Sequence, residues 1–389
     1  MKKDNLLIWG VMTGTSCDGL DISAVDYKRE SWLPLWGKSF PYPKELKKKV
    51  IHLQNPNARI TPKDIFLVNR ELSLWYSDCV LKILKKINKN EHPDLIACHG
   101  QTIAHYPEKK QGSITVQLFD PSFVVNKTGV SVVSHFREGD VAAGGHGAPL
   151  ANAFHQLIID GLGLRKDGVS IHNLGGISNF TYFSPTGKMI SCDTGPANVW
   201  IDAAVEKVTS GKMAFDYNGL LAKKGKIDTK VLIDLFKHPY IKKDIPKTTG
   251  RDDFTLDYFF KKTEKLKGID RVSTATEFTA ATICNAYERF VLKKGHPLKT
   301  ILVSGGGSKN TTLIEWIKIK LPQVDVISIE QTGLDPTFIE AQAFSYLGLR
   351  SLLAAPVGGE WTGVRSWAAP GWITPGKNWN QLIDKIIRF

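Results

Sequence analysis

The chain has 389 residues, a formal net charge of +13 at pH 7, and a globular composition with 42% hydrophobic and 23% charged residues. This length is enough for two domains, and no apolar run approaches the roughly 18 residues that span a bilayer, which disfavours a membrane partner. The lysines form short clusters with acids nearby, without an aromatic RNA-binding motif, a zinc finger or a basic tail, so we expect no nucleic-acid partner. The five scattered cysteines form no C-x-x-C pair, which disfavours a disulfide framework and a zinc site. The chain runs directly into a predicted strand without a signal-peptide pattern, so we expect a cytoplasmic location.

The first half of the chain alternates predicted strands with predicted helices. Polar–apolar alternation and short apolar runs predict strands at residues 6–12, 20–27, 95–98 and 130–134. Apolar residues at helical spacing predict helices at residues 43–53, 61–87 and 148–159. The second of these helices carries a start signal at Thr61-Pro62, and a loop rich in glycine and alanine precedes the third.

The second half repeats this alternation. We expect strands at residues 170–173, 180–183, 189–192, 300–303 and 324–329, and helices at residues 197–208, 273–293, 311–321 and 340–353. Residues 207–217 and 237–253 are predicted loops, and the tail after Pro356 is predicted to be irregular. A strand, a glycine turn and a second strand open each half. We therefore expect an α/β protein with a cleft between two domains.

Four glycine-rich turns follow predicted strands. They are Gly14-Thr15-Ser16-Cys17-Asp18-Gly19, Asn173-Leu174-Gly175-Gly176, Asp193-Thr194-Gly195-Pro196 and Ser304-Gly305-Gly306-Gly307. Glycine lets the main chain approach a ligand and present N–H groups to it, and aspartate holds a metal or takes a proton. The combination favours phosphoryl transfer over passive binding.

Two of the turns each admit two interpretations. Residues 14–21 form either a plain hairpin or a phosphate cradle in which Asp18 holds Mg²⁺ through water, and their composition favours the cradle. Asp193 is either the N-cap of the next helix or a catalytic base, and its distance from the helix favours the base.

The remaining motifs are less specific or exclude other sites. Residues 304–307 lie between a strand and a helix, a typical place for an anion or a nucleotide. The chain has no G-x-G-x-x-G, Walker A, H-E-x-x-H or G-x-S-x-G motif. Their absence disfavours a Rossmann dinucleotide site, a P-loop, a zinc peptidase and a serine hydrolase.

In combination and order, the motifs resemble the anhydro-N-acetylmuramic acid kinases, a family of the sugar kinase/Hsp70/actin superfamily. The matching segments are residues 10–21 (GVMTGTSCDGLD), 99–106 (HGQTIAHY), 140–150 (DVAAGGHGAPL), 173–179 (NLGGISN), 193–198 (DTGPAN), 246–251 (PKTTGR), 304–310 (SGGGSKN) and 340–344 (EAQAF). The resemblance implies a two-domain actin-like ATPase fold with ATP and sugar in the interdomain cleft. Residues 1–134 and 345–389 would form domain I, and residues 135–344 would form domain II.

The resemblance also assigns roles to individual positions. Asp193 matches the family's catalytic base. The implied nucleotide contacts are Gly14, Thr15, Ser16, Cys17, Asp18, Gly19, Leu20, Asp21, Gly175, Gly176, Gly195, Gly305, Gly306, Gly307 and Asn310. The implied sugar contacts are His99, Gln101, Arg137 and Glu340. The implied cofactors are ATP and Mg²⁺, with the metal at Asp18 through water, and the expected assembly is a homodimer.

The implied reaction converts ATP, water and 1,6-anhydro-N-acetylmuramic acid to N-acetylmuramic acid 6-phosphate and ADP, in peptidoglycan recycling. The chain departs from the family pattern at Ala197, where glycine is common, at Glu138-Gly139, and in residues 359–363 (GEWTG). These departures keep open a kinase of the same fold for levoglucosan or another anhydrosugar. A nucleotide-dependent interaction protein is a further alternative, which the fold alone supports.

Overall fold

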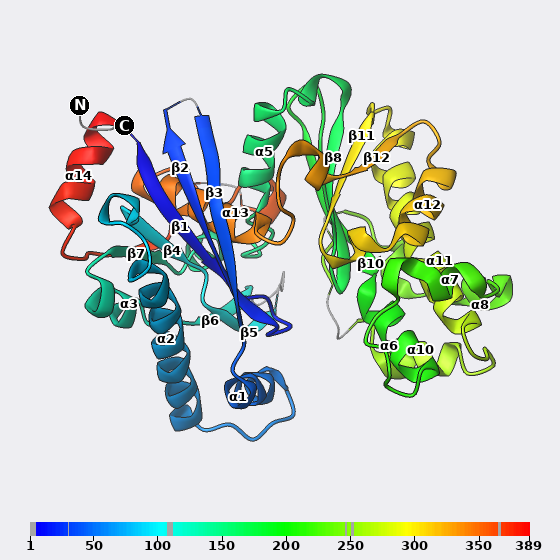
Figure 1. The fold of residues 1–389 in the computed structure, drawn as a ribbon. Helices are drawn as coiled ribbons and strands as arrows, with labels where there is room; N and C mark the ends of the chain where they lie inside the picture. Colours follow the sequence, from blue (N-terminus) through cyan, green and yellow to red (C-terminus); the bar gives the residue numbers. More distant parts are fainter. Residues whose placement is uncertain (1–4, 30, 107–111, 246, 250–252, 365–366) are drawn as a thin grey trace. The chain divides into compact units, whose positions relative to one another are not determined.

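The computed structural model of the chain describes residues 5–29, 31–106, 112–245, 247–249, 253–364 and 367–389 (Figure 1). The chain divides into two compact units. Unit 1 comprises Met1–Leu157 and Thr337–Phe389, and unit 2 comprises Ile158–Pro336. The boundaries predicted after residues 134 and 344 lie elsewhere, because Phe136, Leu150 and Phe344 share one buried cluster with the first strand of unit 1.

Unit 1 is built round a six-stranded mixed sheet. Its strands are β1 (Leu6–Met12), β2 (Gly19–Lys28), β3 (Ser31–Pro41), β4 (Leu95–Cys98), β7 (Ser131–Ser134) and β13 (Trp372–Thr374). They lie in the order β13-β7-β4-β1-β2-β3, with β1, β4 and β7 parallel and the other pairs antiparallel (Figure 1). A separate two-stranded sheet of β5 (Gln101–Tyr106) and β6 (Ile114–Leu118) follows β4.

Helices cover both faces of this sheet. They are α1 (Lys44–Gln54), α2 (Pro62–Leu84), α3 (Pro121–Thr128), α4 (Glu138–Ala142), α5 (Asn152–Gly161), α13 (Ile339–Leu352) and α14 (Trp379–Arg388). Successive side chains of a strand point to opposite faces, so Trp9 packs in the cluster with α1, α2 and α3 while Ile8 packs in the cluster with α5, α13 and α14. Burial on both faces fixes the register of β1 at the centre of the unit.

Unit 2 repeats the same strand order. Its strands are β8 (Val169–Leu174), β9 (Ile177–Phe183), β10 (Met189–Pro196), β11 (Thr300–Ser304) and β12 (Asp325–Ser328). They lie in the order β10-β9-β8-β11-β12, with β8, β11 and β12 parallel and the β8–β9 and β9–β10 pairs antiparallel. The order matches β3-β2-β1-β4-β7 of unit 1. The two units therefore share one strand order, and the predicted α/β class is confirmed.

One long helix organises the rest of unit 2. The helices are α6 (Asn198–Val208), α7 (Leu220–Lys224), α8 (Thr229–Leu235), α9 (Pro239–Lys242), α10 (Leu256–Lys262), α11 (Asp270–Phe290) and α12 (Thr311–Lys320). Ile283 and Tyr287 of α11 pack against the sheet, while Val272 and Phe278 of the same helix pack among α6, α7, α8 and α10. The helix therefore joins the sheet core to the helical core of the unit.

Several elements differ from the prediction, among them α9, which lies within the predicted loop 237–253. β3 was not predicted, because Pro34 and Gly37 interrupt a half-exposed edge strand that has little apolar alternation. The tail after Pro356 was predicted to be irregular, yet it forms β13 and α14, whose Leu382 is buried in the core of unit 1. β10 runs four residues beyond Cys192, its predicted last residue, because it continues to pair with β9 through Pro196.

Candidate functional site

The first candidate feature is the phosphate turn, residues 14–18, which joins the antiparallel strands β1 and β2. The turn is a hairpin connection, and its carbonyl groups are held by the protein. Gly14 O accepts hydrogen bonds from Cys17 N at 3.2 Å and from Gln101 Nε2 at 3.2 Å, and Thr15 O accepts one from Gln54 Nε2 at 3.2 Å. The N–H groups of Thr15 and Ser16 make no hydrogen bond to another described residue. Donors left open on a turn whose carbonyls are occupied suit an anion.

Individual residues of the predicted phosphate cradle differ in what they can offer. The side chains of Cys17 and Leu20 are fully buried in the core, so only their backbones can face a nucleotide. Cys17 has a φ of +55°, and Gly19 and Asp21 already belong to β2. Asp18 is exposed and its Oδ1 lies 3.1 Å from Lys47 Nζ.

The described residues contain no group of three or more histidine, cysteine, aspartate or glutamate side chains that could hold a metal ion. A Mg²⁺ ion bound to phosphates needs only one or two protein carboxylates and keeps several waters. Asp18 fits such a role, and its assignment as a metal ligand stays a prediction.

Gln101, predicted to contact the sugar, has its side chain turned into the protein. It is fully buried, and Nε2 donates to Gly14 O and to Thr102 O, both at 3.2 Å. Its Oε1 accepts from the hydroxyl of Tyr42 at 3.2 Å. The Gln101 side chain therefore holds the phosphate turn through the carbonyl of Gly14.

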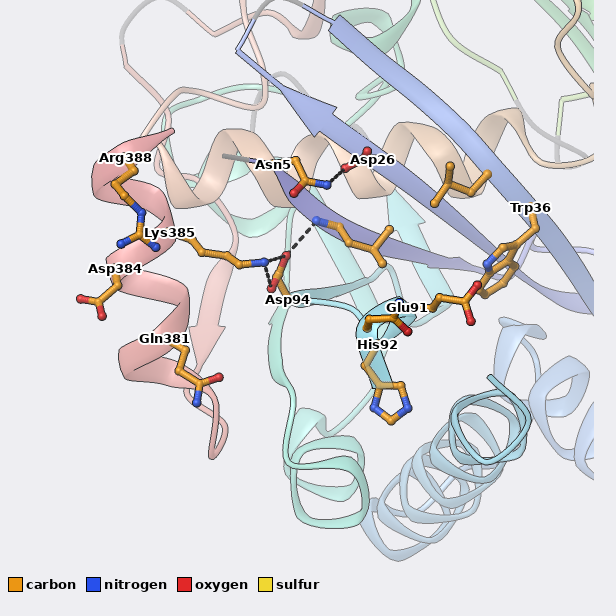
Figure 2. Close-up of a pocket in the computed structure, with 13 residues that line it drawn as sticks. Asn5, Asp26, Trp36, Glu91, His92, Asp94, Gln381, Asp384, Lys385 and Arg388 are labelled. Atoms are coloured by element: carbon orange, nitrogen blue, oxygen red, sulfur yellow. Dashed lines mark hydrogen bonds and ion pairs between the residues drawn. The ribbon is translucent and has the colours of Figure 1, made fainter. Parts of the chain in front are cut away.

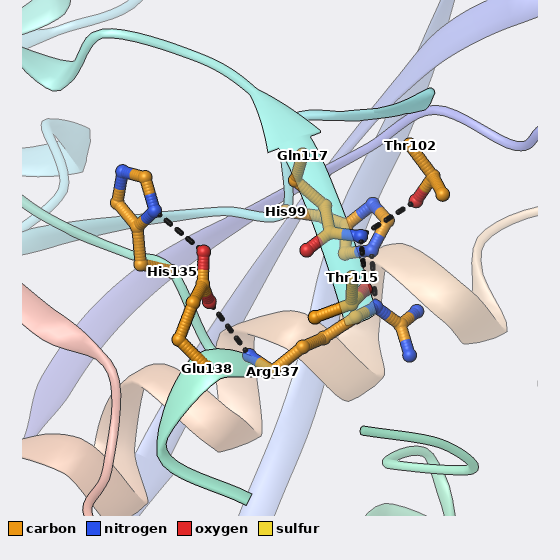
Figure 3. A network of polar contacts seen from close by, with 7 residues as sticks. All are labelled: His99, Thr102, Thr115, Gln117, His135, Arg137 and Glu138. Atoms are coloured by element: carbon orange, nitrogen blue, oxygen red, sulfur yellow. Dashed lines mark hydrogen bonds and ion pairs between the residues drawn. The ribbon is translucent and has the colours of Figure 1, made fainter. Parts of the chain in front are cut away.

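The other predicted sugar residues meet in unit 1. Arg137 Nε donates to Nε2 of His99 at 2.9 Å (Figure 3). Its NH1 donates to Gly147 O at 2.7 Å. Desolvation lowers the pKa of Arg137 to about 10, and the charge of Glu340 opposes this effect. His99 is buried, and desolvation together with the Arg137 charge holds its pKa well below 6.5. The neutral ring keeps a lone pair on Nε2 for the arginine.

Glu340 lies in the first turn of α13, within electrostatic range of Arg137 and Asp21. Desolvation raises the pKa of its carboxyl, Arg137 opposes the rise and Asp21 adds to it. His99, Arg137 and Glu340 thus come from three separate segments of unit 1 and form one polar group. A guanidinium with open N–H groups beside a carboxylate can recognise a polar, anionic sugar.

The loop that carries Arg137 is held in place by a buried carboxylate, Asp140. Its Oδ1 accepts from Gly147 N at 2.6 Å, and its Oδ2 accepts from Thr362 Oγ1 at 2.5 Å. A Cβ at Gly145 would lie 2.2 Å from this carboxylate and one at Gly358 would lie 1.9 Å from it, so only glycine fits at either position. Thr362, in the segment 359–363 that departs from the family pattern, thus holds Asp140 and with it the loop that carries Arg137.

Asp193 occupies a β-bulge in unit 2. The register of β10 against β9 shifts between Asp193 and Gly195, and bulges re-aim side chains at functional sites. Oδ2 of Asp193 accepts a hydrogen bond from Thr249 N at 2.8 Å. The backbone N–H of Asp193 donates to Lys247 O at 3.4 Å, and the backbone carbonyl of Asp193 accepts from Tyr240 OH at 2.9 Å. The N-cap position of α6 is Ala197, so Asp193 is not a helix cap. Of the segment PKTTGR, Pro246, Gly250 and Arg251 lie outside the described residues.

The pKa of Asp193 is unusual for an aspartate. Desolvation raises it to about 7, and the Thr249 N–H and the Lys247 charge work in the opposite direction. A half-buried carboxylate with a pKa near neutrality can take a proton at physiological pH and hold it through a reaction step.

The glycine turns of unit 2 meet at Asn198, which sequence reasoning did not select. Asn198 Nδ2 donates to Leu174 O at 3.0 Å, and a Cβ at Gly307 would lie 2.8 Å from Asn198 Oδ1. Gly305 has a φ of +80°, and a Cβ there would lie 2.3 Å from Asn173 Oδ1. Contacts between the turns therefore leave no space for a side chain at Gly305 or Gly307. The signal for Asn198 was its place in the segment 193–198 (DTGPAN), at the start of α6.

Three further predicted nucleotide contacts, Gly175, Gly176 and Asn310, have structural roles. Gly175 O and Gly176 O accept from the N–H groups of residues 197–199, so the start of α6 has little capacity left for an anion. Asn310 is buried and caps α12 through a hydrogen bond of 3.0 Å from Leu313 N. Gly306 and Gly195 leave ordinary space, with Asn198 Nδ2 3.7 Å and Ile241 Cδ1 3.7 Å from the respective Cβ positions.

A cavity of about 850 Å³ lies elsewhere in unit 1, at the beginning of β1 (Figure 2). Leu7, Trp36, Asp94 and Lys385 line it, and Lys385 Nζ lies 2.7 Å from Asp94 Oδ1. The phosphate turn follows the other end of β1, and none of the predicted site residues lines this cavity.

Among the helices of the described residues, none has the length and apolar composition that a membrane-spanning helix requires.

The model of the family described as anhydro-N-acetylmuramic acid kinase matches residues 6–376, and the chain belongs to this family.

Named relatives extend over most of the chain. The anhydro-N-acetylmuramic acid kinase of Caldanaerobacter subterraneus is 35% identical over 90% of this chain and 92% of its own length. That of Rhodococcus erythropolis is 34% identical over 97% and 96%. Among solved structures, a ROK family glucokinase from Streptomyces griseus covers 88% of this chain and 98% of its own at 12% identity, with a TM-score of 0.40.

Proposed function

We propose that the protein phosphorylates 1,6-anhydro-N-acetylmuramic acid with ATP and opens its anhydro bridge with water. The products are N-acetylmuramic acid 6-phosphate and ADP, as expected for an enzyme of peptidoglycan recycling. The observation that carries the proposal is Asp193, held at a bulge by Thr249 N at 2.8 Å with its pKa raised to about 7. Membership of the family supports the choice of sugar.

In the proposed reaction, Asp193 takes a proton from water as the water oxygen bonds to C1 of the sugar. The bond between C1 and the bridging oxygen breaks, and that oxygen, which stays on C6, bonds to the γ-phosphorus of ATP as ADP leaves. The bridging oxygen carries no proton, so the base acts on water and not on the phosphoryl acceptor. One carboxylate thus serves both hydrolysis and transfer.

In unit 1, the open N–H groups of Thr15 and Ser16 would bind phosphate. In unit 2, the turn of residues 304–307 is the predicted nucleotide contact. Mg²⁺ arriving with ATP would neutralise phosphate charge, with Asp18 as the carboxylate offered to it. Arg137 and Glu340 would bind the sugar, and we assign the lactyl carboxylate to Arg137 because a planar guanidinium fork pairs well with a carboxylate. A cytoplasmic homodimer remains part of the proposal.

An isotope experiment tests this function. With ATP, Mg²⁺ and 1,6-anhydro-N-acetylmuramic acid in ¹⁸O-water, the label should enter the C1 hydroxyl of the sugar phosphate and not inorganic phosphate. Asp193→Asn should lower the rate of label incorporation by at least ~10²-fold while nucleotide binding persists. Label in inorganic phosphate at a comparable rate would indicate an ATPase and would favour the interaction-protein alternative.

A further inference from the structure

Lys247 is a buried cation for which the proposed reaction provides no direct role. Its side chain is only 7% exposed, and Nζ lies 4.6 Å from the ring centre of Tyr240 and 5.4 Å from that of Phe290. The ammonium group makes no hydrogen bond or ion pair to another residue of the described chain. Taking a charge out of water costs free energy, and two aromatic faces offset only part of that cost.

The groups near Lys247 differ in the charge that they carry near pH 7. Burial raises the pKa of the Cys192 thiol to about 12 and that of the Tyr240 hydroxyl far above its ordinary range, so both are neutral near pH 7. Asp253 accepts a hydrogen bond from Thr249 Oγ1 at 2.7 Å. Among the described residues, Asp193 is the carboxylate whose charge raises the pKa of Lys247, and the Lys247 charge in turn lowers the pKa of Asp193.

The other cations in this neighbourhood are engaged or exposed. Arg289 donates to Asp244 Oδ1 at 2.6 Å and to the carbonyls of residues 241–243. Lys243 is exposed, with its Nζ 5.3 Å from the ring centre of Tyr240. Lys247 is the cation whose charge lowers the pKa of the Asp193 carboxyl.

Lys247 is also linked to Asp193 by a backbone hydrogen bond, and both residues contact Tyr240. Lys247 O accepts from Asp193 N at 3.4 Å, and the Tyr240 ring beneath the ammonium donates its hydroxyl to Asp193 O at 2.9 Å. A shift of either residue therefore moves the other. This coupling gives the cation a fixed position relative to the base.

We propose that Lys247 is the positioning residue that keeps the Asp193 carboxylate ionised and ready to accept a proton at neutral pH. The proposal rests on the proposed function of Asp193 as the base. Lys247 itself neither gains nor loses a proton in the step: the proton of the attacking water goes to Asp193, and the ammonium charge stays where it is.

The test compares Lys247→Met and Lys247→Gln, which remove the charge, with Lys247→Arg, which keeps it, and with Lys243→Met as a matched control on the same Tyr240 ring. For each full-length protein, the pH dependence of kcat/KM for the anhydrosugar is measured. The Asp193 carboxyl is also titrated by ¹³C NMR without ligands, with Asp193→Asn identifying its resonance. Circular dichroism confirms the fold of each variant.

We expect both neutral variants to move the acid limb of the pH profile and the Asp193 titration upward by about one pH unit or more, as loss of a neighbouring opposite charge requires. Lys247→Arg and Lys243→Met should leave both near the wild-type position. An unmoved Asp193 titration in the neutral variants would overturn the proposal, as would a raised KM for ATP with an unmoved acid limb, which would assign Lys247 to the phosphates. The NMR titration needs no turnover, so it separates failure of this proposal from failure of Asp193 as the base.

Discussion

Arg137 donates from Nε to Nε2 of His99 at 2.9 Å, and this hydrogen bond fixes both the tautomer of the histidine and the direction of the arginine fork. The His99 ring packs against Phe344, with 4.5 Å between ring centres. The second arginine contact runs from NH1 to Gly147 O at 2.7 Å, and NH2 makes no hydrogen bond to a described residue. His99 therefore acts as a support for Arg137, although the sequence had assigned it to the sugar directly.

Replacing His99 should weaken sugar binding selectively. His99→Phe retains an aromatic ring beside Phe344 but leaves Arg137 Nε without an acceptor, at a cost of about 1–3 kcal/mol for a buried donor. We expect KM for the anhydrosugar to rise roughly tenfold or more, with KM for ATP nearly unchanged. Steady-state kinetics with each substrate varied in turn measure the two effects. His105→Asn is the control, because His105 bonds to Thr115 and not to Arg137.

Replacing Gln101 should have the opposite selectivity. Gln101→Leu removes the hydrogen bond from Nε2 to Gly14 O, so the phosphate turn loses one of the groups that hold its carbonyls inward. At about 1 kcal/mol for each lost hydrogen bond, KM for ATP should rise roughly 5- to 30-fold. KM for the sugar should change little. A selective rise in the sugar KM would instead return Gln101 to the sugar contacts.

The sequence predicted most strands and most of the longer helices because their apolar periodicity is local, and it missed short helices such as α3, α7 and α10. It also selected Asp193, whose signal lies within four residues of the chain. It did not reveal Thr249 as the partner of that carboxylate, because 56 residues separate the two in sequence. Lys247 was missed for the same reason. Gln101 was given a ligand role because a polar residue after a strand shows its chemistry in the sequence but not the direction of its side chain.

Acid should destabilise the fold through its buried histidines. Desolvation lowers the pKa of His155 to about 4 and that of His172 to about 3, below the ordinary value of 6.5. Between pH 6.5 and these folded-state values the unfolded chain binds more protons than the native one, so the free energy of unfolding falls as pH falls. The expected loss is about 1.4 kcal/mol for each pH unit and each such histidine.

His155 gives a clean test of this linkage, since its Nδ1 has no hydrogen-bond partner in the described structure. His155→Leu should take up about one proton fewer than wild type on unfolding in denaturant near pH 5, measured by potentiometric titration. Equal proton uptake by the two proteins would mean that His155 is already protonated when folded.

The last prediction concerns substrate choice. We expect 1,6-anhydro-N-acetylmuramic acid to be preferred over levoglucosan by at least ~10-fold in kcat/KM, because a site built for a carboxylate and an N-acetyl group leaves polar groups unpaired when both are missing. Arg137→Lys should narrow this preference, since an ammonium lacks the planar fork that pairs with the lactyl carboxylate and cannot donate to both His99 and the sugar in the same geometry. Side-by-side kinetics on both sugars, with wild type and the variant, measure the ratio. Equal or better turnover of levoglucosan by wild type would leave the role of Asp193 unchanged. It would show that Arg137 does not bind a lactyl carboxylate, and it would favour the alternative of a levoglucosan kinase.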